Sequence, residues 1–247
     1  MIKVGVLGAR GRMGSQVCQT VMAAGDMEIG AAVDQGDARD PLAGCDVVVD
    51  FTHPGAVLDN LRWCIGKGLD TIVGTSGFDE PKLAQVSVWL GDAPGVRVLV
   101  VPNFSVGAVL MMRFAEQAAR FFTSAEVIEL HHAGKADAPS GTASRTATMI
   151  AEARTAAGLG APPDATVTAL DGARGTALGG GVHVHSVRLA GLVAHQEVLF
   201  GGPGEVLTIR HDSMDRVSFM PGVLLAIRGM VGLSAGLTVG LDPLLGL

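Results

Sequence analysis

Two histidines and a lysine stand close together in the middle of the chain. His131 and His132 are adjacent, and Lys135 follows three residues after the second histidine. An imidazole exchanges a proton near neutral pH, and a lysine in cationic or dehydrated surroundings can have a lowered pKa and donate a proton. Adjacent residues of a strand point to opposite faces, so His131 and His132 are expected to do different jobs. The cluster indicates general acid–base chemistry.

The start of a helix follows this cluster, at Pro139, Ser140, Gly141 and Thr142. A serine or threonine caps a helix N-terminus, and the free N–H groups of the first turn, with hydroxyls, bind anions. This combination suits a small substrate that carries carboxylates. A plain helix cap with solvated histidines is the alternative. A metal site is not expected, because adjacent histidines are too close along a strand to share an ion easily and no third ligand is obvious.

A glycine-rich segment near the N-terminus has a spacing typical of phosphate-binding loops. It comprises Gly8, Ala9, Arg10, Gly11, Arg12, Met13 and Gly14, between an expected strand and an expected helix. Gly8 permits a tight turn, Gly11 lets backbone N–H groups approach a pyrophosphate, and Gly14 allows close helix packing. The helix N-terminus supplies a favourable field for the anion. A tight turn without a ligand is the alternative.

Charged residues near this loop bear on the choice of dinucleotide. Asp34 lies 20 residues after Gly14, at the end of the second expected strand. A carboxylate there can accept hydrogen bonds from the ribose and favour NAD. Arg10 and Arg12 flank the loop, where a guanidinium can bind the 2′-phosphate of NADP. Both features are present, so we expect NADH or NADPH as cofactor and leave the preference open.

Three later strand ends are expected on the ligand side of the sheet, because ligands of doubly wound sheets bind outside the carboxyl ends of the strands. Small and polar residues there let a cofactor pass close to the backbone. An ordinary loop is the alternative for each. The residues are Asp50, Phe51, Thr52, His53 and Pro54, then Gly74, Thr75, Ser76, Gly77 and Phe78, then Val101, Pro102, Asn103 and Phe104.

The elements that must position these residues alternate between short apolar runs and helical patterns. Strands are expected at 2–7, 27–33, 47–51, 71–73 and 96–101, and helices at 13–24, 56–65 and 80–90. Apolar strands that alternate with helices predict a parallel sheet covered on both faces. We expect an α/β protein whose residues 1–105 form a doubly wound, Rossmann-type dinucleotide-binding domain.

The pattern changes after residue 105. Helices are expected at 105–122, 140–154 and 220–231, strands at 125–130, 182–188, 196–200 and 206–211, and a loop or irregular strands at 155–181. This predicts a smaller α+β substrate domain, residues 106–213, with a mixed or antiparallel sheet. We assign residues 214–247 to the first domain, because the last helix can return to it.

Composition disfavours several classes of protein. The net charge is −6 without a basic tract, which argues against nucleic-acid and membrane-surface binding. No uninterrupted apolar stretch approaches the ~18 residues that span a membrane. Cys18, Cys45 and Cys64 have neither metal nor redox spacing, so we expect buried, reduced thiols and a reducing cytosol.

Nearly the whole chain resembles the dihydrodipicolinate reductase family, also called 4-hydroxy-tetrahydrodipicolinate reductases, of the diaminopimelate route to lysine. The matching strings are VGVLGARGRMG, VVVDFTHP, VGTSGF, VPNFSVGAVLM, RLAGLVAHQEVLF and, most specifically, ELHHAGKADAPSGTA. The resemblance implies a cytoplasmic enzyme that reduces a cyclic dicarboxylate with NADH or NADPH and loss of water, giving tetrahydrodipicolinate. It also implies a homotetramer built through the sheet of residues 106–213.

The resemblance further implies a role for each matching residue. His131 would act as proton donor or acceptor, and Lys135 as proton donor. A substrate carboxylate would be held by His132, Ser140, Gly141 and Thr142, and the cofactor would bind at residues 8–13, 74–76 and 101–104 and at Asp34. Arg188 and His195, in the RLAGLVAHQEVLF string, are expected to be structural.

One departure from the family pattern lies between the second histidine and the lysine. This chain has Ala133 and Gly134 there, where many members carry a bulkier or basic residue just before the lysine. Less positive charge and a more flexible backbone beside Lys135 are expected to change the rate or the substrate affinity.

Two other functions stay open on the residues alone. One is another dehydrogenase of this architecture, acting on aspartate semialdehyde or homoserine. The semialdehyde enzyme would need a nucleophilic cysteine, and none of the three cysteines lies near a strand end with a partner histidine. The other is a nucleotide sensor or scaffold without turnover, which would have no need of the histidine–lysine cluster.

Overall fold

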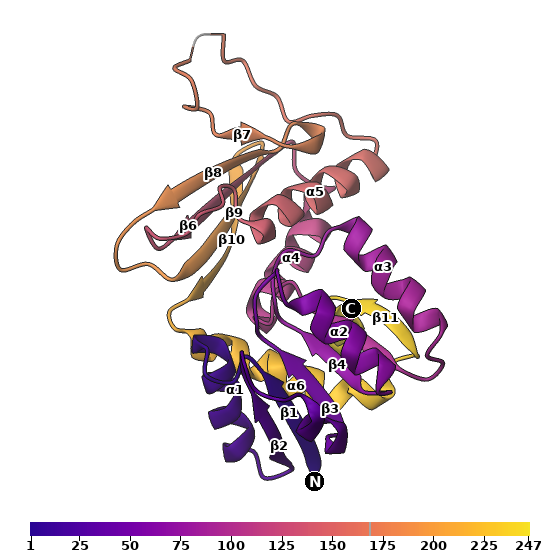
Figure 1. Ribbon diagram of the computed structural model, residues 1–247. Helices are drawn as coiled ribbons and strands as arrows, with labels where there is room; N and C mark the ends of the chain where they lie inside the picture. Colours follow the sequence, from indigo (N-terminus) through magenta and orange to yellow (C-terminus); the bar gives the residue numbers. More distant parts are fainter. Residues whose placement is uncertain (168) are drawn as a thin grey trace. The chain divides into compact units, whose positions relative to one another are not determined.

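The computed structural model describes residues 1–167 and 169–247, and the chain divides into two compact units. The first unit combines Met1–Val106 with Arg216–Leu247, and the second is Gly107–Asp215. Figure 1 shows the elements along the chain. Thr168, within the loop expected at 155–181, lies outside the described residues.

The first unit is built on a six-stranded sheet in the order β11-β5-β4-β3-β1-β2, and all neighbouring strands are parallel. The strands are β1 (Ile2–Leu7), β2 (Met27–Val33), β3 (Val47–Asp50), β4 (Asp70–Val73), β5 (Arg97–Val100) and β11 (Gly236–Val239). The helices are α1 (Arg12–Ala23), α2 (Val57–Gly66), α3 (Glu80–Gly91), α6 (Met220–Gly229) and α7 (Asp242–Leu245). The predicted Rossmann-type fold is confirmed.

Both faces of this sheet are buried. Val98 and Val100 of β5 pack in one cluster with residues of α2 and α3. Leu99 between them points to the opposite face and is also fully buried, so that face is covered as well. Helix α1 packs against β1, β2 and α6. Burial on both sides explains why the strands are continuous apolar runs.

Strand β11 is absent from the strands that the sequence pattern predicts. It is only four residues long, and all four are half-buried, so its pattern is weak. Its register places Gly236 beside Arg97 and Val239 beside Val100. Arg97 strengthens this edge, because its Nε donates to the Leu233 carbonyl at 2.9 Å. Only the folded chain brings these segments together.

The second unit contains a five-stranded sheet in the order β10-β9-β6-β8-β7. The strands are β6 (Ser124–His131), β7 (Thr176–Ala177), β8 (His183–Arg188), β9 (Ala194–Gly202) and β10 (Glu205–Ser213), and the helices are α4 (Val106–Ala119) and α5 (Gly141–Ala156). Strands β6 and β8 are parallel, and the other pairs are antiparallel. The prediction of a mixed sheet is confirmed, and a purely antiparallel sheet is excluded.

Small side chains bring the helices of the second unit close to its sheet. Helices α4 and α5 contribute mostly alanines to a buried cluster, and the strands contribute valines, one alanine and one phenylalanine. The members include Ala115, Ala119, Ala143, Ala147, Val127, Val198 and Phe200. The apolar face of the sheet is therefore covered by closely packed helices.

Several predicted boundaries differ by a few residues. Strand β3 ends at Asp50, so Phe51 already belongs to the following loop. Helix α4 ends at Ala119 instead of residue 122, and α6 ends at Gly229 before a 3-10 turn, Met230–Gly232. Further 3-10 turns lie at Asp40–Gly44, Gly179–Gly181 and Arg216–Phe219.

Gly222 of α6 occupies a position that leaves no room for a methyl group. A Cβ there would lie 1.9 Å from the carbonyl oxygen of Phe104, in the segment after β5. We expect Gly222→Ala to lower the free energy of unfolding by about 1–3 kcal/mol, measured in urea. Gly91→Ala is the control, since a Cβ at Gly91 meets no described atom within 4 Å, and it should stay within about 0.5 kcal/mol of the parent. Parental stability of Gly222→Ala would show that this contact is not tight.

Candidate active site

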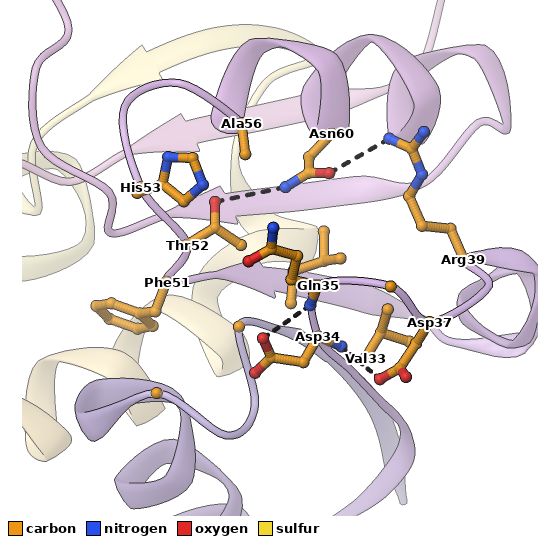
Figure 2. Close-up of a pocket in the computed structure, with 14 residues that line it drawn as sticks. Val33, Asp34, Gln35, Asp37, Arg39, Phe51, Thr52, His53, Ala56 and Asn60 are labelled. Carbon is orange, nitrogen blue, oxygen red and sulfur yellow. Dashed lines mark hydrogen bonds between the residues drawn. The ribbon is translucent and has the colours of Figure 1, made fainter.

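A pocket of about 470 Å³ lies in the first unit, at the carboxyl ends of β1, β2 and β3 (Figure 2). Its walls include Gly8 and Gly11 after β1, residues 34–37 after β2, and residues 51–53 after β3. Doubly wound sheets bind their ligands at this end of the strands. The pocket thus lies where the sequence predicts a cofactor.

The glycine loop has the steric properties that its spacing predicts. Gly8 has a φ of 79°, and a Cβ on Gly14 would lie 2.0 Å from the Gly8 carbonyl oxygen. Gly11 is the N-cap of α1, and no side chain among the described residues caps this helix. The N–H groups of the first turn therefore point to the loop without a side-chain acceptor, which is the arrangement that binds phosphates.

Asp34 lies against this loop as an ionised carboxylate. Its Oδ1 accepts a hydrogen bond from the Gln35 N–H at 2.7 Å, and its Oδ2 accepts one from the Arg10 N–H at 2.6 Å. These two hydrogen bonds hold the pKa of Asp34 below its ordinary value. A carboxylate has further lone pairs, so Asp34 can still accept hydrogen bonds from a ribose.

The two arginines of the loop differ in their surroundings. The Arg10 guanidinium pairs with Asp37 at 2.8 Å and donates to the Gln35 carbonyl at 3.3 Å. Its charge is therefore already balanced by a carboxylate of the pocket. Arg12 is exposed at the first residue of α1. Asp34, which also lines the pocket, carries a negative charge that favours a ribose hydroxyl over a 2′-phosphate.

A buried carboxylate joins the loops after β3 and β4. Asp50 is fully buried, and it accepts hydrogen bonds from the N–H and hydroxyl of Thr52, at 2.8 and 2.7 Å, and from the hydroxyl of Thr75 at 2.9 Å. The Asn60 amide donates to its other oxygen at 2.9 Å. Figure 2 shows Asn60 between Thr52 and Arg39. Sequence analysis missed both Asn60 and Arg39.

Aromatic rings from two strand ends meet in the first unit. The rings of Phe51 and Phe104 lie with their centroids 5.3 Å apart, and a Cβ on Gly74 would lie 2.2 Å from the Phe51 ring. A Cβ on Gly8 would lie 2.6 Å from the Phe51 carbonyl oxygen. The glycine loop therefore adjoins the strand ends after β3, β4 and β5.

The other predicted cofactor residues have different surroundings. Thr75 is buried against Asp50, and the Val101 N–H donates to the Val73 carbonyl at 2.9 Å. Side chains at both positions face the interior, so only their backbones can meet a ligand. Ser76 and Pro102 are exposed.

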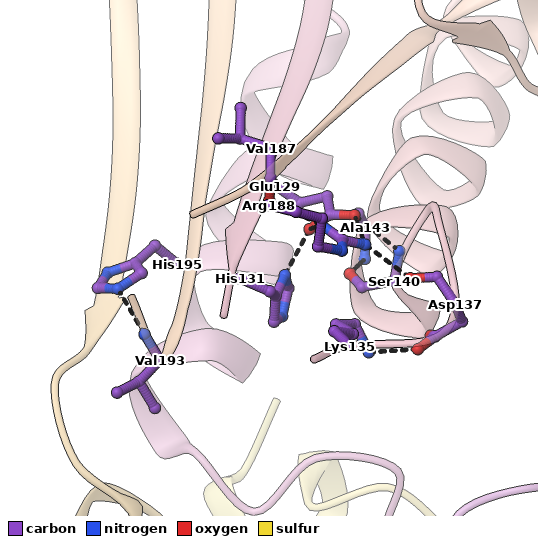
Figure 3. A network of polar contacts seen from close by, with 10 residues as sticks. All are labelled: Glu129, His131, Lys135, Asp137, Ser140, Ala143, Val187, Arg188, Val193 and His195. Carbon is purple, nitrogen blue, oxygen red and sulfur yellow. Dashed lines mark hydrogen bonds and ion pairs between the residues drawn. The ribbon is translucent and has the colours of Figure 1, made fainter. Parts of the chain in front are cut away.

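The histidine–lysine cluster lies in the second unit, at the edge where β6 and β8 end (Figure 3). His131 and Arg188 are register partners in the last pair of these parallel strands. Fully buried Glu129 accepts hydrogen bonds from the two terminal nitrogens of Arg188, at 2.9 and 2.8 Å, and contacts Nδ1 of His131. The Ser140 N–H also donates to Glu129, at 3.2 Å.

Burial lowers the pKa of His131, and the hydrogen bond to Glu129 opposes this effect without cancelling it. The imidazole is therefore largely neutral at pH 7. His132 is exposed, immediately after the strand ends. The two histidines have different environments, as expected for adjacent residues at a strand end.

Lys135 lies in a turn after His132, because its N–H donates to the His132 carbonyl at 3.1 Å. Its Nζ pairs with Asp137 at 2.6 Å, while the Asp137 carbonyl accepts a hydrogen bond from Arg188 at 2.6 Å. The lysine is thereby connected to the edge of the sheet. A Cβ on Gly134 would lie 3.4 Å from the His132 ring, which is an ordinary van der Waals contact.

Ser140 is the N-cap of α5. Its hydroxyl accepts the Ala143 N–H at 3.1 Å, and the residue is buried. The Ser140 oxygen is thus engaged in the cap. Gly141 is exposed and Thr142 is half-buried in the first turn, which carries no acidic residue. This helix N-terminus keeps the field that favours an anion.

His195 has structural partners in the second unit. Its Nδ1 lies 2.7 Å from Asp212, and its Nε2 accepts the Val193 N–H at 3.2 Å. Arg188 is bound to Glu129, as described above. The partners of both residues agree with a structural role.

The three cysteines are free, with Cys45 and Cys64 buried and Cys18 only half-buried, in contrast to the prediction. Burial raises the pKa of Cys64 to about 12 and also raises the pKa of Cys18 and of Cys45. None is a thiolate nucleophile at neutral pH.

Among the described residues, no helix combines the length and apolarity needed to cross a bilayer.

Two family models match this chain in succession. The model "Dihydrodipicolinate reductase, N-terminus" matches residues 2–104, and "Dihydrodipicolinate reductase, C-terminus" matches residues 107–245. The chain belongs to the dihydrodipicolinate reductase family. Members of this family are oxidoreductases that use NADH or NADPH and act on a small dicarboxylate.

Relatives match over their full length. The 4-hydroxy-tetrahydrodipicolinate reductase of Cutibacterium acnes is 63% identical over 247 residues, covering 100% of both chains. That of Nocardia farcinica is 62% identical over 248 residues, covering 100% of this chain and 99% of its own. The dipicolinate-bound dihydrodipicolinate reductase of Paenisporosarcina sp. TG-14 is 38% identical, with a TM-score of 0.82, covering 98% of this chain and 99% of its own. The family predicted from the sequence motifs is confirmed.

The dinucleotide used by this family fits the first unit. Helix α1 starts without a side-chain cap, and Gly14 lets it pack closely on the loop, because a Cβ there would lie 2.0 Å from the Gly8 carbonyl oxygen. Asp34 supplies an ionised acceptor beside it. These properties agree with a pyrophosphate next to the loop and a ribose next to Asp34.

We expect Asp34→Ala to weaken NADH binding about 10-fold and NADPH binding less, because the lost carboxylate accepts from a ribose hydroxyl but repels a 2′-phosphate. Fluorescence titration with each dinucleotide measures both dissociation constants. Asp92→Ala, at an exposed acid that follows α3, is the control and should change neither. An equal loss of affinity for NADH and NADPH would contradict the proposal that Asp34 binds the ribose.

Proposed function

We propose that this chain reduces 4-hydroxy-tetrahydrodipicolinate to tetrahydrodipicolinate with loss of water, using NADH or NADPH. The observation that carries the proposal is the joint position of His131, Lys135 and the N-terminus of α5 at one sheet edge. A reduction that leaves electron density on the substrate needs a proton donor, and a dicarboxylate needs an anion site. This edge supplies both.

The cofactor is proposed to bind the first unit at residues 8–13, 74–76 and 101–104 and at Asp34. When bound, a reduced nicotinamide supplies the hydride. The N–H groups at the start of α1 bind the pyrophosphate of the dinucleotide, and Asp34 accepts a hydrogen bond from its ribose. Phe51 lines the pocket, and its half-buried ring packs on buried Phe104, so Phe51 offers an apolar surface for an aromatic ring.

A substrate carboxylate is proposed to bind between exposed His132 and the first turn of α5, at Gly141 and Thr142. Arg188 is nearby, but its guanidinium is bound to Glu129. The anion site therefore depends on backbone N–H groups, the Thr142 hydroxyl and His132. Ser140 shapes this site as the cap of the helix.

Lys135 is proposed as the proton donor and His131 as its partner in proton exchange. An ammonium group carries a proton at neutral pH, whereas largely neutral His131 can accept one. Asp137 holds the Lys135 Nζ at 2.6 Å, which limits the rotamers of a long side chain. Lys135 is only six residues before Gly141, the first residue of α5, so a substrate that binds at this helix start lies near the lysine in the chain.

We further propose that the protein is a cytoplasmic homotetramer. Its free cysteines agree with a reducing compartment. The sheet face of the second unit that points away from α4 and α5 carries half-buried Ile128, Leu130 and Leu199, which suit an interface between copies. Light scattering should give four times the mass of one chain, and a monomer would contradict this part of the proposal.

We expect Lys135→Ala to lower kcat by about 10²–10⁴-fold, because the proton donor is lost, with little change in NADH binding. The assay follows nicotinamide absorbance with freshly prepared cyclic substrate. Lys67→Ala, a lysine beside Trp63 in the first unit, is the control and should keep the parental kcat. Parental turnover by Lys135→Ala would exclude the donor role, and an inactive parent would exclude the proposed reaction.

A further inference from the structure

Glu129 is a buried carboxylate for which the proposed reaction provides no role. Its side chain is fully shielded from solvent, on the face of β6 that packs against the helices. Burying an isolated carboxylate costs several kcal/mol, so an ionised Glu129 can stay buried only if its partners compensate this cost. These partners are the Arg188 guanidinium, the Ser140 N–H and Nδ1 of His131 (Figure 3).

The partners of Glu129 determine where the proton of His131 lies. Burial raises the pKa of Glu129, but hydrogen bonds from Arg188, Ser186 and His131 outweigh this effect and lower it below the ordinary value. An ionised carboxylate only accepts hydrogen bonds, so the Nδ1 that contacts it must carry a hydrogen. In the neutral imidazole, the lone pair then lies on Nε2.

We propose that Glu129 is a positioning residue, which holds His131 as the Nδ1–H tautomer and leaves Nε2 as the atom that exchanges a proton with the substrate. The statement about substrate rests on the proposed function. The tautomer itself depends only on the contact with Glu129.

The same carboxylate joins three elements of the site. His131 ends β6, Arg188 ends β8, and Ser140 caps α5, and all three bind Glu129. Arg188 also donates to the Asp137 carbonyl, and the Asp137 carboxylate pairs with Lys135. Orientation of the imidazole and of the ammonium group therefore depends on one anchoring network.

Glu126 provides a matched comparison on the same strand. It lies three residues before Glu129, so its side chain points to the opposite face of the sheet. It also binds one arginine and one histidine, Arg174 and His185, each at 2.7 Å. His185 is the register partner of Ile128, so it lies with Glu126 on the face opposite Glu129. Glu126→Gln therefore tests whether the loss of a similar carboxylate network on the other face lowers kcat.

The charged groups that face His131 fix the sign of the expected change. Glu129 favours the imidazolium, whereas Lys135 on its own segment and Arg188 on β8 oppose it. Asp137 lies beyond Lys135, to which it is paired. Removing the charge of Glu129 leaves two cations beside the ring, so the pKa of His131 must fall.

The first test needs no substrate and no variant of Glu129. The parent protein is labelled with ¹⁵N-histidine, and His131 is assigned by the resonances that disappear in His131→Gln. Long-range ¹H–¹⁵N spectra, recorded at a pH above the pKa of His131 so that the ring is neutral, should show Nδ1 protonated and Nε2 unprotonated. A resonance pattern of the Nε2–H tautomer would overturn the proposal.

The second test is Glu129→Gln, with Glu126→Gln as control. We expect Glu129→Gln to lower kcat at least about 10-fold, with little change in NADH binding. The His131 titration should move to lower pH by about one unit or more. Glu126→Gln should keep the parental kcat and the parental His131 titration. If Glu129→Gln folds and keeps both, Glu129 has no positioning role.

A third variant covers a failure of Glu129→Gln to fold. Glu129→Asp keeps the charge but shortens the side chain, so it should fold with Arg188 still paired and lose the parental contact with His131. A kcat near that of the parent would overturn the proposal. Absence of reductase activity in the parent would instead remove the proposed function, while the tautomer measurement would still decide how Glu129 holds His131.

Discussion

The ion pair between Glu129 and Arg188 is the interaction on which the candidate active site depends. A carboxylate that is fully buried is tolerated only when its charge is compensated and its oxygens are hydrogen-bonded. Arg188 meets both needs with a guanidinium that binds both oxygens of Glu129. This pair joins the ends of parallel strands β6 and β8, and Glu129 also binds the N–H of Ser140, the cap of α5, so it fixes the segment between His131 and Ser140 at both ends. The chemistry of His131 and Lys135 therefore rests on an interaction that contacts neither cofactor nor substrate in the proposed roles.

The two helices that begin at proposed binding sites differ in a way that suits their ligands. Helix α1 starts at Gly11 without a side-chain cap, so its first N–H groups remain open to a pyrophosphate that approaches the backbone closely. Helix α5 starts at Ser140, whose hydroxyl already occupies the Ala143 N–H. Neither first turn carries an acidic residue, so both keep a field that favours anions. The two proposed anion sites thus combine with a net charge of −6 for the whole chain.

The features predicted from the sequence depend on local physical constraints. The glycine loop and strands β1 and β2 follow from apolar runs and from positions where a Cβ has no room, and both are properties of a few consecutive residues. The features that were missed depend on distant pairs. Arg188 and Glu129 are 59 residues apart, Thr75 and Asp50 are 25 apart, and β11 pairs with β5 across most of the chain. The ion pair with Asp37 is a further example, because it balances the charge of Arg10, a residue that the loop pattern suggested as a partner for the 2′-phosphate of NADP. No periodicity in the sequence reports such contacts.

A double-mutant cycle on the Glu129–Arg188 pair tests this account most directly. The free energy of unfolding is measured for the parent, Glu129→Gln, Arg188→Met and the double variant. Arg188→Met alone leaves a buried, uncompensated carboxylate, whereas in the Glu129→Gln background it removes only a cation without a partner. The account predicts that Arg188→Met costs about 1–3 kcal/mol more in the parent than in the Glu129→Gln background. Additive effects of the two substitutions would contradict it.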